Sequence, residues 1–306
     1  MKKSLFLFAI ALLVSICSPA FAQTPEPMAP PPVLLIVRED IKAGKMPAHS
    51  KHSAAYARAF AKLQTTNHRL ALVPVAGSEN EVVYLTAAGS FAGIEKMQRD
   101  TDKTMSGVAG PMKAELDRLN NEQPDLHSAM RDLLTAYRPE LSFNPGVNIA
   151  QMRYFVITTV RVRPGHDAAY ADYVRSVVNV ARDKANLDNY HVACFQVISG
   201  APGGTYMFFR AMKSLGELDQ NVGAKVRAAM SDDMKKAADK ANADAVIVSE
   251  SAPYAFDPSM SYVAKETAAQ DPGFWNPKPQ KAAMVKKRAK KPATEKPTGT
   301  QPPAKQ

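Results

Sequence analysis

Cysteine is almost absent from this chain of 306 residues, which has only Cys17 and Cys194. Cys17 lies in an N-terminal segment that is expected to be removed, so the mature chain would keep one thiol and form no intramolecular disulfide. Cys194 stands among Val192, Phe195 and Val197, as in a strand interior, which favours a buried apolar thiol over a reactive one. Packing alone must therefore stabilise the fold.

Catalytic motifs and long apolar runs are missing as well. The chain contains no G-x-S-x-G element that would present a nucleophilic serine. The glycines of Gly200–Gly204 join two predicted strands, so no helix N-terminus faces a phosphate there. After the N-terminal segment, no apolar run is long enough to span a membrane. The sequence therefore predicts no catalytic residue.

The N-terminal segment has the layout of an export signal. Met1–Lys3 is basic, Leu5–Ile16 is apolar, and Ala20–Ala22 has the small residues of a cleavage site. Residues 1–22 are therefore predicted to be a signal peptide, and the protein is expected to be exported to a bacterial periplasm or secreted. Lipid attachment at Cys17 is the alternative, but a bulky isoleucine precedes it.

Proline and positive charge are concentrated near the two ends. Residues 23–32 are predicted to form a proline-rich linker. Residues 261–306 are predicted to form a disordered Lys/Pro/Ala-rich tail. From Lys278 onward this tail carries eight Lys and one Arg against one Glu, so most of the formal net charge of +10 belongs to it. The rest is balanced, which argues against specific nucleic-acid binding. The tail is expected to be solvated, or to contact anionic envelope polymers or lipid head groups.

The part between linker and tail repeats one order of elements. Residues 151–260 predict a strand, a helix after a Pro-Gly turn, a hairpin, further helices and a last strand. The strands are expected at Tyr154–Arg163, Tyr190–Ile198, Thr205–Arg210 and Ala245–Glu250. Residues 33–150 repeat this order, with strands at Val33–Glu39, Leu70–Val75 and Glu81–Ala87, and helices at about Pro47–Gln64, Phe91–Lys103, Gly110–Asn120 and Leu126–Leu134. The two copies predict a duplicated domain.

Residues of the two copies can be matched in pairs. The pairs are His52 with His166, His68 with His191, Tyr84 with Tyr206, and Phe143 with Phe256. Both faces of the strands are apolar, so the sheet face without helices must also be buried. The sequence therefore predicts an α+β fold of two tandem ferredoxin-like repeats, antiparallel sheets with helices on one face, that form an intrachain α/β barrel.

Two stretches carry a resemblance to a known superfamily. They are Val160–His166, which leads into a helix, and Glu81–Tyr84, which is followed by Ser90–Ile94. Over about Val33–Pro258 the chain resembles the dimeric α/β-barrel superfamily in tandem form, which includes NIPSNAP-like and antibiotic-biosynthesis-monooxygenase-like proteins. The resemblance implies two activities: haem binding, with His127 or His191 as the proximal ligand, or cofactor-independent oxygenation, with His191 or Tyr206 as the polar group.

Candidate ligand-binding residues come from the matched pairs and from the strands. Tyr84, Tyr206, Phe208, Phe195 and Met207 offer the aromatic and soft apolar walls of a pocket, although barrel filling also explains them. Arginines on strands pair with a carboxylate such as Glu39 or contact an anionic ligand; these are Arg38, Arg161 and Arg163. The resulting candidates are His191, Tyr206, Arg161, Tyr84, His68, His52 and His166.

A metal site is not predicted. His49 and His52 are spaced to lie on one helix face and could share a metal ion, but the sequence identifies no third or fourth ligand. No cofactor is predicted either.

With no catalytic cluster in view, the sequence favours an exported, non-catalytic module that binds a small apolar or aromatic ligand or an envelope partner. The alternative, implied by the resemblance alone, is a cofactor-independent oxygenase or a haem-binding or haem-processing enzyme.

Overall fold

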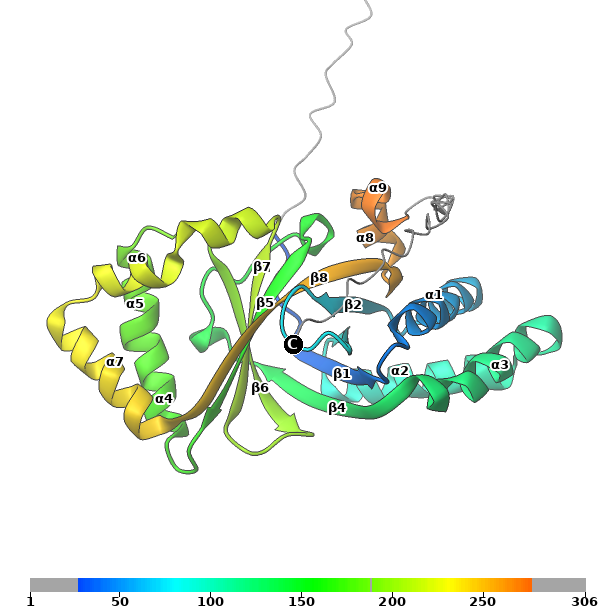
Figure 1. The fold of residues 1–306 in the computed structure, drawn as a ribbon, viewed down its shortest axis with the longest axis horizontal. Coiled ribbons are helices and arrows are strands. Elements are labelled where there is room, and N and C mark those ends of the chain that lie inside the picture. Colours follow the sequence, from blue (N-terminus) through cyan, green and yellow to red (C-terminus); the bar gives the residue numbers. More distant parts are fainter. Residues whose placement is uncertain (1–26, 188, 277–306) are drawn as a thin grey trace, which may run out of the picture.

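Eight antiparallel strands close into one barrel (Figure 1). The computed structural model describes residues 27–187 and 189–276. The strands follow one another around the barrel in the order β1-β3-β2-β8-β5-β7-β6-β4. Their bounds are β1 Val33–Ile41, β2 Arg69–Pro74, β3 Glu81–Ala88, β4 His127–Tyr137, β5 Tyr154–Val162, β6 His191–Ser199, β7 Thr205–Met212 and β8 Val246–Tyr262.

The helices lie outside the barrel, in one group beside each half (Figure 1). The first group is α1 Met46–Leu63, α2 Phe91–Ser106 and α3 Gly110–Leu126. The second group is α4 Asp167–Tyr173, α5 Asn179–Lys184, α6 Val222–Ala229 and α7 Asp232–Ala245, with a π-helical turn at Val174–Val178 joining α4 to α5. Two short helices, α8 Lys265–Gln270 and α9 Pro272–Trp275, follow β8.

Each half has the strand order of a ferredoxin-like layer, β4-β1-β3-β2 in the first and β8-β5-β7-β6 in the second. The halves join where β2 pairs with β8, with Leu72 opposite Phe256, and where β4 pairs with β6, with Thr135 opposite Val197. Closure leaves no sheet edge unpaired. The predicted α+β fold, two tandem ferredoxin-like repeats forming an intrachain α/β barrel, is confirmed.

The turn before the first helix of each half shows which residues of the two halves are equivalent. Gly44 has φ 75° and Gly165 has φ 83°, a left-handed conformation that glycine adopts without strain. The next residue, Lys45 or His166, is the N-cap of the helix. His166 therefore matches Lys45, and the predicted match of His166 with His52 is wrong.

The register of strand pairing shows which strand residues of the two halves are equivalent. Tyr84 on β3 lies opposite Val37 of β1, and Phe208 on β7 lies opposite Thr158 of β5. These positions are equivalent, so Tyr84 matches Phe208 and the predicted match with Tyr206 is wrong. A shift of two residues keeps the side chain on the same sheet face, which is why an alignment of apolar patterns misses it.

The same register supports one predicted match and corrects another. His68 precedes β2 at the position of His191 on β6, as predicted. Phe256 on β8, however, occupies the place of Tyr137 on β4. Phe143 lies outside the named strands and forms only an isolated bridge.

Two predicted boundaries are corrected. The stretch Leu126–Leu134, expected to be a helix, is mostly strand β4, because its backbone pairs with β1. Here long-range pairing overrides helical spacing. Past residue 260, where a disordered tail was expected, β8 continues to Tyr262, and Trp275 on α9 is buried with its indole N–H donating to the carbonyl of Ala150. Order thus extends to Asn276.

Other predictions fall outside the described residues. These are the signal peptide at residues 1–22, the first part of the linker, and the basic tail beyond residue 276. In the described part, Met28 of the linker pairs with Val147. None of the helices described there combines the length and the apolar character that crossing a membrane requires.

The apolar core has two layers. One fills the barrel with residues such as Ile36, Leu72, Ile157, Phe195 and Phe209. The other lies between the outer sheet face and the helices, and it differs between the halves. Beside the second half, an apolar cluster borders a cavity of about 290 Å³, which Arg182, Arg210 and Asn242 also line. Beside the first half, the cavity is about 410 Å³, and its wall includes the buried carboxylate of Glu39.

Candidate functional site

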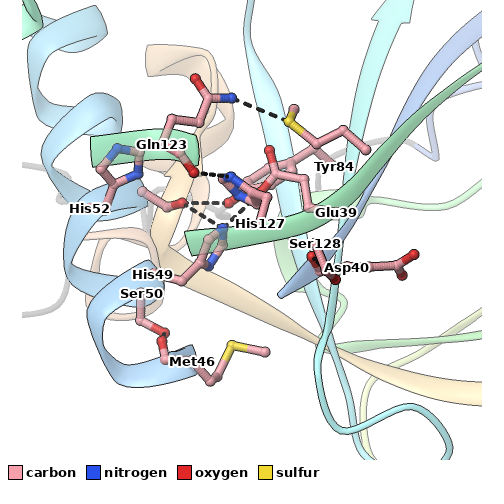
Figure 2. A network of polar contacts seen from close by, with 12 residues as sticks. Glu39, Asp40, Met46, His49, Ser50, His52, Tyr84, Gln123, His127 and Ser128 are labelled. Carbon is pink, nitrogen blue, oxygen red and sulfur yellow. Dashed lines mark hydrogen bonds and ion pairs between the residues drawn. The ribbon is translucent and has the colours of Figure 1, made fainter. Parts of the chain in front are cut away.

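Three side chains from three elements meet under the first group of helices. Glu39 comes from β1, His49 from α1, and His127 from the first position of β4 (Figure 2). One oxygen of Glu39, Oε2, lies 2.7 Å from Nε2 of His49 and 3.1 Å from Nε2 of His127. We call these three residues the Glu39 cluster.

Local sequence explains why they meet. Glu39 and Val37 alternate with the inward-facing Arg38, so their side chains point to the outer face of β1. His49 lies in the first turn of α1, on the side that packs over this face, and is fully buried. His127 ends α3 and starts β4, so the change of direction places its ring beside Glu39.

The partners of His127 limit its protonation state. Its Nδ1 lies 2.9 Å from the carbonyl oxygen of Gln123, which can only accept, so Nδ1 must donate. Its Nε2 faces the carboxylate of Glu39, which is also an acceptor when ionised. Either His127 is an imidazolium, or a cation other than a proton lies between Nε2 and the carboxylate.

His49 has an unsatisfied atom. Its Nε2 faces Glu39 Oε2 and lies 3.4 Å from the hydroxyl of Ser53. Its Nδ1 is buried and has no hydrogen-bond partner among the described residues. Tyr84 extends the network, because its hydroxyl donates to Ser53 Oγ at 2.8 Å.

Glu39 is held as a carboxylate. Burial opposes its ionisation, but the hydrogen bond from His49 and the charges of His49, His127 and Arg69 outweigh burial and lower the pKa of the Glu39 carboxyl. An ionised carboxylate beside two imidazoles is a set of donor atoms that suits a divalent cation. The three donor atoms all lie within 4.8 Å of one another.

A cavity opens beside the cluster. It has a volume of about 410 Å³ and lies between the outer face of β1 and β3 and the first group of helices; we call it the outer cavity. Glu39, Ser53, His127 and Tyr84 line it, whereas His49 lies behind them. The remaining wall is mixed. Its apolar and aromatic part consists of Leu35, Val37, Tyr56, Phe60, Met97 and Met130, and its polar part includes Asn67, Arg69, Thr101, Asp102 and Asp132. A small molecule in this cavity would contact the cluster directly.

Two of the sequence candidates line the outer cavity. Tyr84 is buried on β3, and burial, followed by the charge of Glu39, raises the pKa of its hydroxyl well above the usual value. His52 follows His49 on α1, but its Nε2 lies 2.8 Å from the carbonyl oxygen of Leu119 and takes no part in the cluster. The proposed pairing of His49 with His52 on one metal is therefore wrong, since the two rings face different partners.

Two other candidates lie at one end of the barrel. His68 and His191 line a second cavity of about 370 Å³, here called the barrel-end cavity, with apolar walls that include Phe155 and Phe209. The Nδ1 of His191 lies 2.6 Å from the carbonyl oxygen of Asn144. Burial lowers the pKa of His68. The two matched histidines thus share a cavity, but no carboxylate lines it.

The remaining candidates lie apart from both cavities. Tyr206 is buried under the second group of helices, where its hydroxyl donates to Asp167 Oδ1 at 3.0 Å. Arg161 is half-buried, and its Nε has no partner among the described residues. His166 is half-buried at the N-cap of α4. His166 became a candidate through the wrong match with His52, Arg161 as an arginine on a strand, and Tyr206 as an aromatic residue of a pocket wall.

The other residues singled out from the sequence have structural roles. Arg38 points into the barrel and pairs with Glu81, at 2.7 Å from Nε to Oε1, and not with Glu39. Arg163 is exposed. Cys194 is fully buried, and burial raises the pKa of its thiol far above the usual value, as expected of an inert thiol.

For His127, haem binding stays a prediction; its Nδ1 faces Gln123 and its Nε2 faces Glu39. For His191, haem binding stays a prediction.

The sequence reading missed Glu39 as a site residue and weighed His127 only for haem. Glu39 and His127 are separated by 88 positions and look ordinary in isolation. A signal was nevertheless present in the repeat. At the equivalent positions of the second half, Val160 replaces Glu39 and Val246 replaces His127, so a correct alignment sets polar residues against apolar ones.

Comparison with known proteins extends the fold assignment. No protein-family model matches the chain, and no curated protein matches it. Among solved structures, one described as a monooxygenase of Fusobacterium nucleatum has 9% identity and a TM-score of 0.47, covering 75% of this chain and 94% of that one. A mutant chlorite dismutase of Candidatus Nitrospira defluvii has 7% identity and a TM-score of 0.45, covering 80% and 97%. An uncharacterised NIPSNAP domain protein of Burkholderia xenovorans has 17% identity and a TM-score of 0.25, covering 33% and 90%.

These neighbours are of the kinds that the resemblance named, and they share the fold only. Their descriptions name a monooxygenase and a chlorite dismutase. The preferred reading from the sequence, a non-catalytic module, is corrected by the structure of this chain itself. It depended on the absence of a catalytic cluster, and the structure brings Glu39, His49 and His127 together at a cavity.

Proposed function

We propose that this protein is a metal-dependent enzyme of the oxygenase class, which acts on a small aromatic molecule in the outer cavity. One observation carries the proposal: two imidazole nitrogens and one carboxylate oxygen converge at the wall of that cavity. Two histidines and one carboxylate, with further positions open to substrate, are the ligand set of non-haem iron oxygenases.

The surroundings of the cluster support metal binding. A ligating histidine commonly donates its other ring N–H to a carbonyl, which fixes the tautomer that presents a lone pair to the metal. His127 meets this requirement through Gln123. A cation would also replace the proton that the contact between His127 and Glu39 otherwise requires.

The lining of the cavity favours an aromatic substrate. Tyr56, Phe60 and Tyr84 present rings, and Met97 and Met130 present soft apolar side chains. Zinc hydrolases also use two histidines and a glutamate. The aromatic rings and methionines of the wall favour oxygenation of an aromatic ring over hydrolysis of a polar substrate.

The chain's own residues have defined tasks in this proposal. A bound metal would supply Lewis acidity and a position for oxygen or substrate. Glu39, His49 and His127 would hold it, and the aromatic wall would orient the substrate and exclude water. Tyr84 and Ser53 form a hydrogen-bonded path between the cavity and His49, which can hold a proton near the reacting group.

Metal binding is the first test. Protein stripped with a chelator is titrated with Fe(II) without oxygen, and separately with Mn(II) and Zn(II), by calorimetry. We expect one ion per chain, and we expect Glu39→Gln and His127→Asn to weaken binding at least about 100-fold, since even indirect partners of a metal site typically matter 10–100-fold. His52→Asn is the matched control, because His52 lines the same cavity but faces Leu119. Binding that is absent, or that these two variants leave unchanged, would refute the metal site.

Oxygen uptake is the second test. The iron-loaded protein is offered a panel of catechols, hydroquinones and hydroxybenzoates in an oxygen electrode. Uptake that requires iron and is lost in Glu39→Gln is the expected result. Uptake that survives complete metal removal would instead favour the cofactor-independent oxygenase. Export, which the N-terminal sequence predicts, is tested separately by locating the protein in fractionated host cells.

A further inference from the structure

We infer that the substrate of the outer cavity is an anion, an aromatic carboxylate held by Arg69. The inference rests on the proposed function for the reaction, but its evidence is independent of the Glu39 cluster. It comes from one arginine and two further polar groups in the cavity wall.

The guanidinium of Arg69 lies over two aromatic rings. Arg69 is the first residue of β2, and its guanidinium carbon lies 4.6 Å from the ring centre of Tyr84 and 5.4 Å from that of Phe60. Such contacts use the faces of the rings and leave the N–H groups to find acceptors elsewhere. Arg69 lines both the outer cavity and the barrel-end cavity, so its guanidinium borders space that a ligand can occupy.

Arg69 has no hydrogen-bonded acceptor among the described residues, and its Nε is buried without a partner. Arg38, Arg131 and Arg153 each pair with a carboxylate, whereas Arg182 donates to the amide oxygen of Asn179 and Arg161 Nε is unpartnered like that of Arg69. A guanidinium has five N–H donors and stays charged in proteins. Glu39, Asp102 and Asp132 line the same cavity, and the charge of Arg69 acts on Glu39, but none of these carboxylates is hydrogen-bonded to Arg69. A partly buried guanidinium without hydrogen-bonded acceptors is costly, which leaves a place for the carboxylate of a ligand.

Two more polar atoms around the same cavity lack partners. They are Oδ1 of Asn67, in the loop before β2, and Oγ1 of Thr101, on α2. Buried polar groups are nearly always hydrogen-bonded, so three exceptions at one cavity require an explanation. The three atoms have almost no accessible surface, so a ligand with an anionic group and a further polar group meets them only if these side chains turn toward the cavity.

Tyr84 links Arg69 to the reactive centre. Its ring stacks against the guanidinium, and its hydroxyl donates to Ser53, which contacts His49. A carboxylate on Arg69 therefore leaves the rest of the molecule along the Tyr84 ring, in the direction of the Glu39 cluster. Arginine binds carboxylates through two parallel N–H···O bonds, which would fix this orientation.

The apolar wall determines the body of the ligand. Leu35, Val37 and Phe60 offer no hydrogen bonds but a broad surface for a planar ring. An aliphatic dicarboxylate or a sugar acid would leave polar groups against this surface. The chemistry thus selects an aromatic carboxylate, with a hydroxyl substituent as the partner for Asn67 or Thr101.

Binding of matched acids and amides tests the inference. Metal-free full-length protein is titrated with benzoate, salicylate and 4-hydroxybenzoate, and with the corresponding neutral amides, by ligand-observed NMR. We expect each acid to bind at least about 10-fold more tightly than its amide, which corresponds to about 1.4 kcal/mol. Arg69→Gln should abolish the preference, and Arg69→Lys should restore part of it, since lysine keeps the charge but loses the paired geometry.

Controls separate this inference from the proposed function. Arg131→Gln removes a charge from the exposed part of β4 and should leave the acid preference intact. Circular dichroism and thermal unfolding establish that Arg69→Gln is folded. Equal binding of acids and amides, or no binding of either, overturns the inference, because water would then be what satisfies Arg69. Arg69→Gln should still bind one metal ion per chain, since Arg69 is not a metal ligand, although the loss of a positive charge near Glu39 changes the affinity. If the protein preferred acids but bound no metal, the proposed function would be wrong and this inference would hold. If it bound metal but showed no preference for acids, only this inference would be wrong.

Discussion

The two halves of the barrel share a backbone but differ in the layer between sheet and helices. At each position of the Glu39 cluster the second half has an apolar or aromatic residue. Val160 occupies the position equivalent to Glu39, Tyr170 the position equivalent to His49, and Val246 the position equivalent to His127. In the second half these three residues belong to one apolar cluster under α4 and α7.

Other residues that line the outer cavity also have apolar equivalents in the second half. Phe208 stands for Tyr84, and Val192 for Arg69, both within the same apolar cluster of the second half. A ferredoxin-like layer is therefore stable without any of these polar groups. Because buried polar networks seldom stabilise a fold more than apolar packing does, their presence in one half alone is best explained by a task other than stability.

The largest expected loss of stability comes from truncating core residues inside the barrel, and it tests whether the two halves share one core. Leu72 on β2 and Phe195 on β6 are equivalent and almost fully buried inside the barrel. We expect Leu72→Ala to cost about 2–5 kcal/mol and Phe195→Ala about 3–5 kcal/mol of unfolding free energy, from lost burial and cavity formation. Urea unfolding monitored by circular dichroism measures both. If either substitution cost less than about 1 kcal/mol, the two halves would not share a single core.

A smaller loss of stability is expected when a glycine at either hairpin tip is replaced by alanine, and the loss should differ between the two halves. Gly200 has φ 91°, and a Cβ there would overlap the carbonyl oxygen of Asp132, because the tip of the second hairpin crosses onto β4. Gly77 in the first hairpin has φ 112°, and its nearest atom would be the Cβ of Ala252 at 3.7 Å. We expect Gly200→Ala to cost about 2–4 kcal/mol, from backbone strain and overlap, and Gly77→Ala about 1–2 kcal/mol from strain alone. Thermal unfolding of the pair measures the difference, and equal losses would contradict the close approach at the seam.

The fold was predictable from the sequence because its signals are local and repeated. Strand patterns, the Pro-Gly turn before α4 and the duplicated order of elements required no long-range information. The strand β4 was not predictable in this way. Its residues have helical spacing, and they become a strand only because β1 and β6 offer backbone partners on both sides.

The site was less accessible, for a different reason. Glu39, His49 and His127 form a site only after β1, α1 and β4 have packed together. The repeat contained the missing information, but the sequence matches of His52 with His166 and Tyr84 with Tyr206 shifted the alignment. Only strand pairing and the two glycine turns determine the register to the residue.

The comparison is sharpened most directly by converting one half into the other. The triple substitution Glu39→Val, His49→Tyr and His127→Val introduces the residues of the second half. We expect the metal-free variant to be as stable as wild type or more stable by up to about 4 kcal/mol, because apolar packing replaces a buried ionic network. The single substitution Glu39→Val should instead destabilise by about 1–3 kcal/mol, since it leaves two buried imidazoles without their shared acceptor.

Denaturant unfolding with a chelator present measures the stability of these variants, and calorimetry measures metal affinity, which the triple variant should lack. If the triple variant were less stable than the single one, the first half would depend on the Glu39 cluster for folding. The contrast between a functional and a structural layer would then be lost.

The smallest effect concerns a polar contact that only the second half has. Tyr206 donates to Asp167, whereas its equivalent on β3 is the apolar Val82. Burial and the hydrogen bond to Asp167 raise the pKa of Tyr206 to about 12, above its value in the unfolded chain. The contribution of the Tyr206 hydroxyl to folding stability is therefore fully present below about pH 10, where tyrosine in the unfolded chain is protonated. It is lost as the pH rises toward 12.

Tyr206→Phe should cost about 1 kcal/mol at pH 8, and the advantage of wild type over this variant should shrink at pH 11. Urea unfolding of both proteins at the two pH values isolates Tyr206, because all other tyrosines are common to them. An advantage that stays constant from pH 8 to pH 11 would mean that the pKa of Tyr206 does not differ between folded and unfolded states. The hydrogen bond from Tyr206 to Asp167 would then add nothing to the stability of the second half, whose other polar contacts include the bond from Arg182 to Asn179.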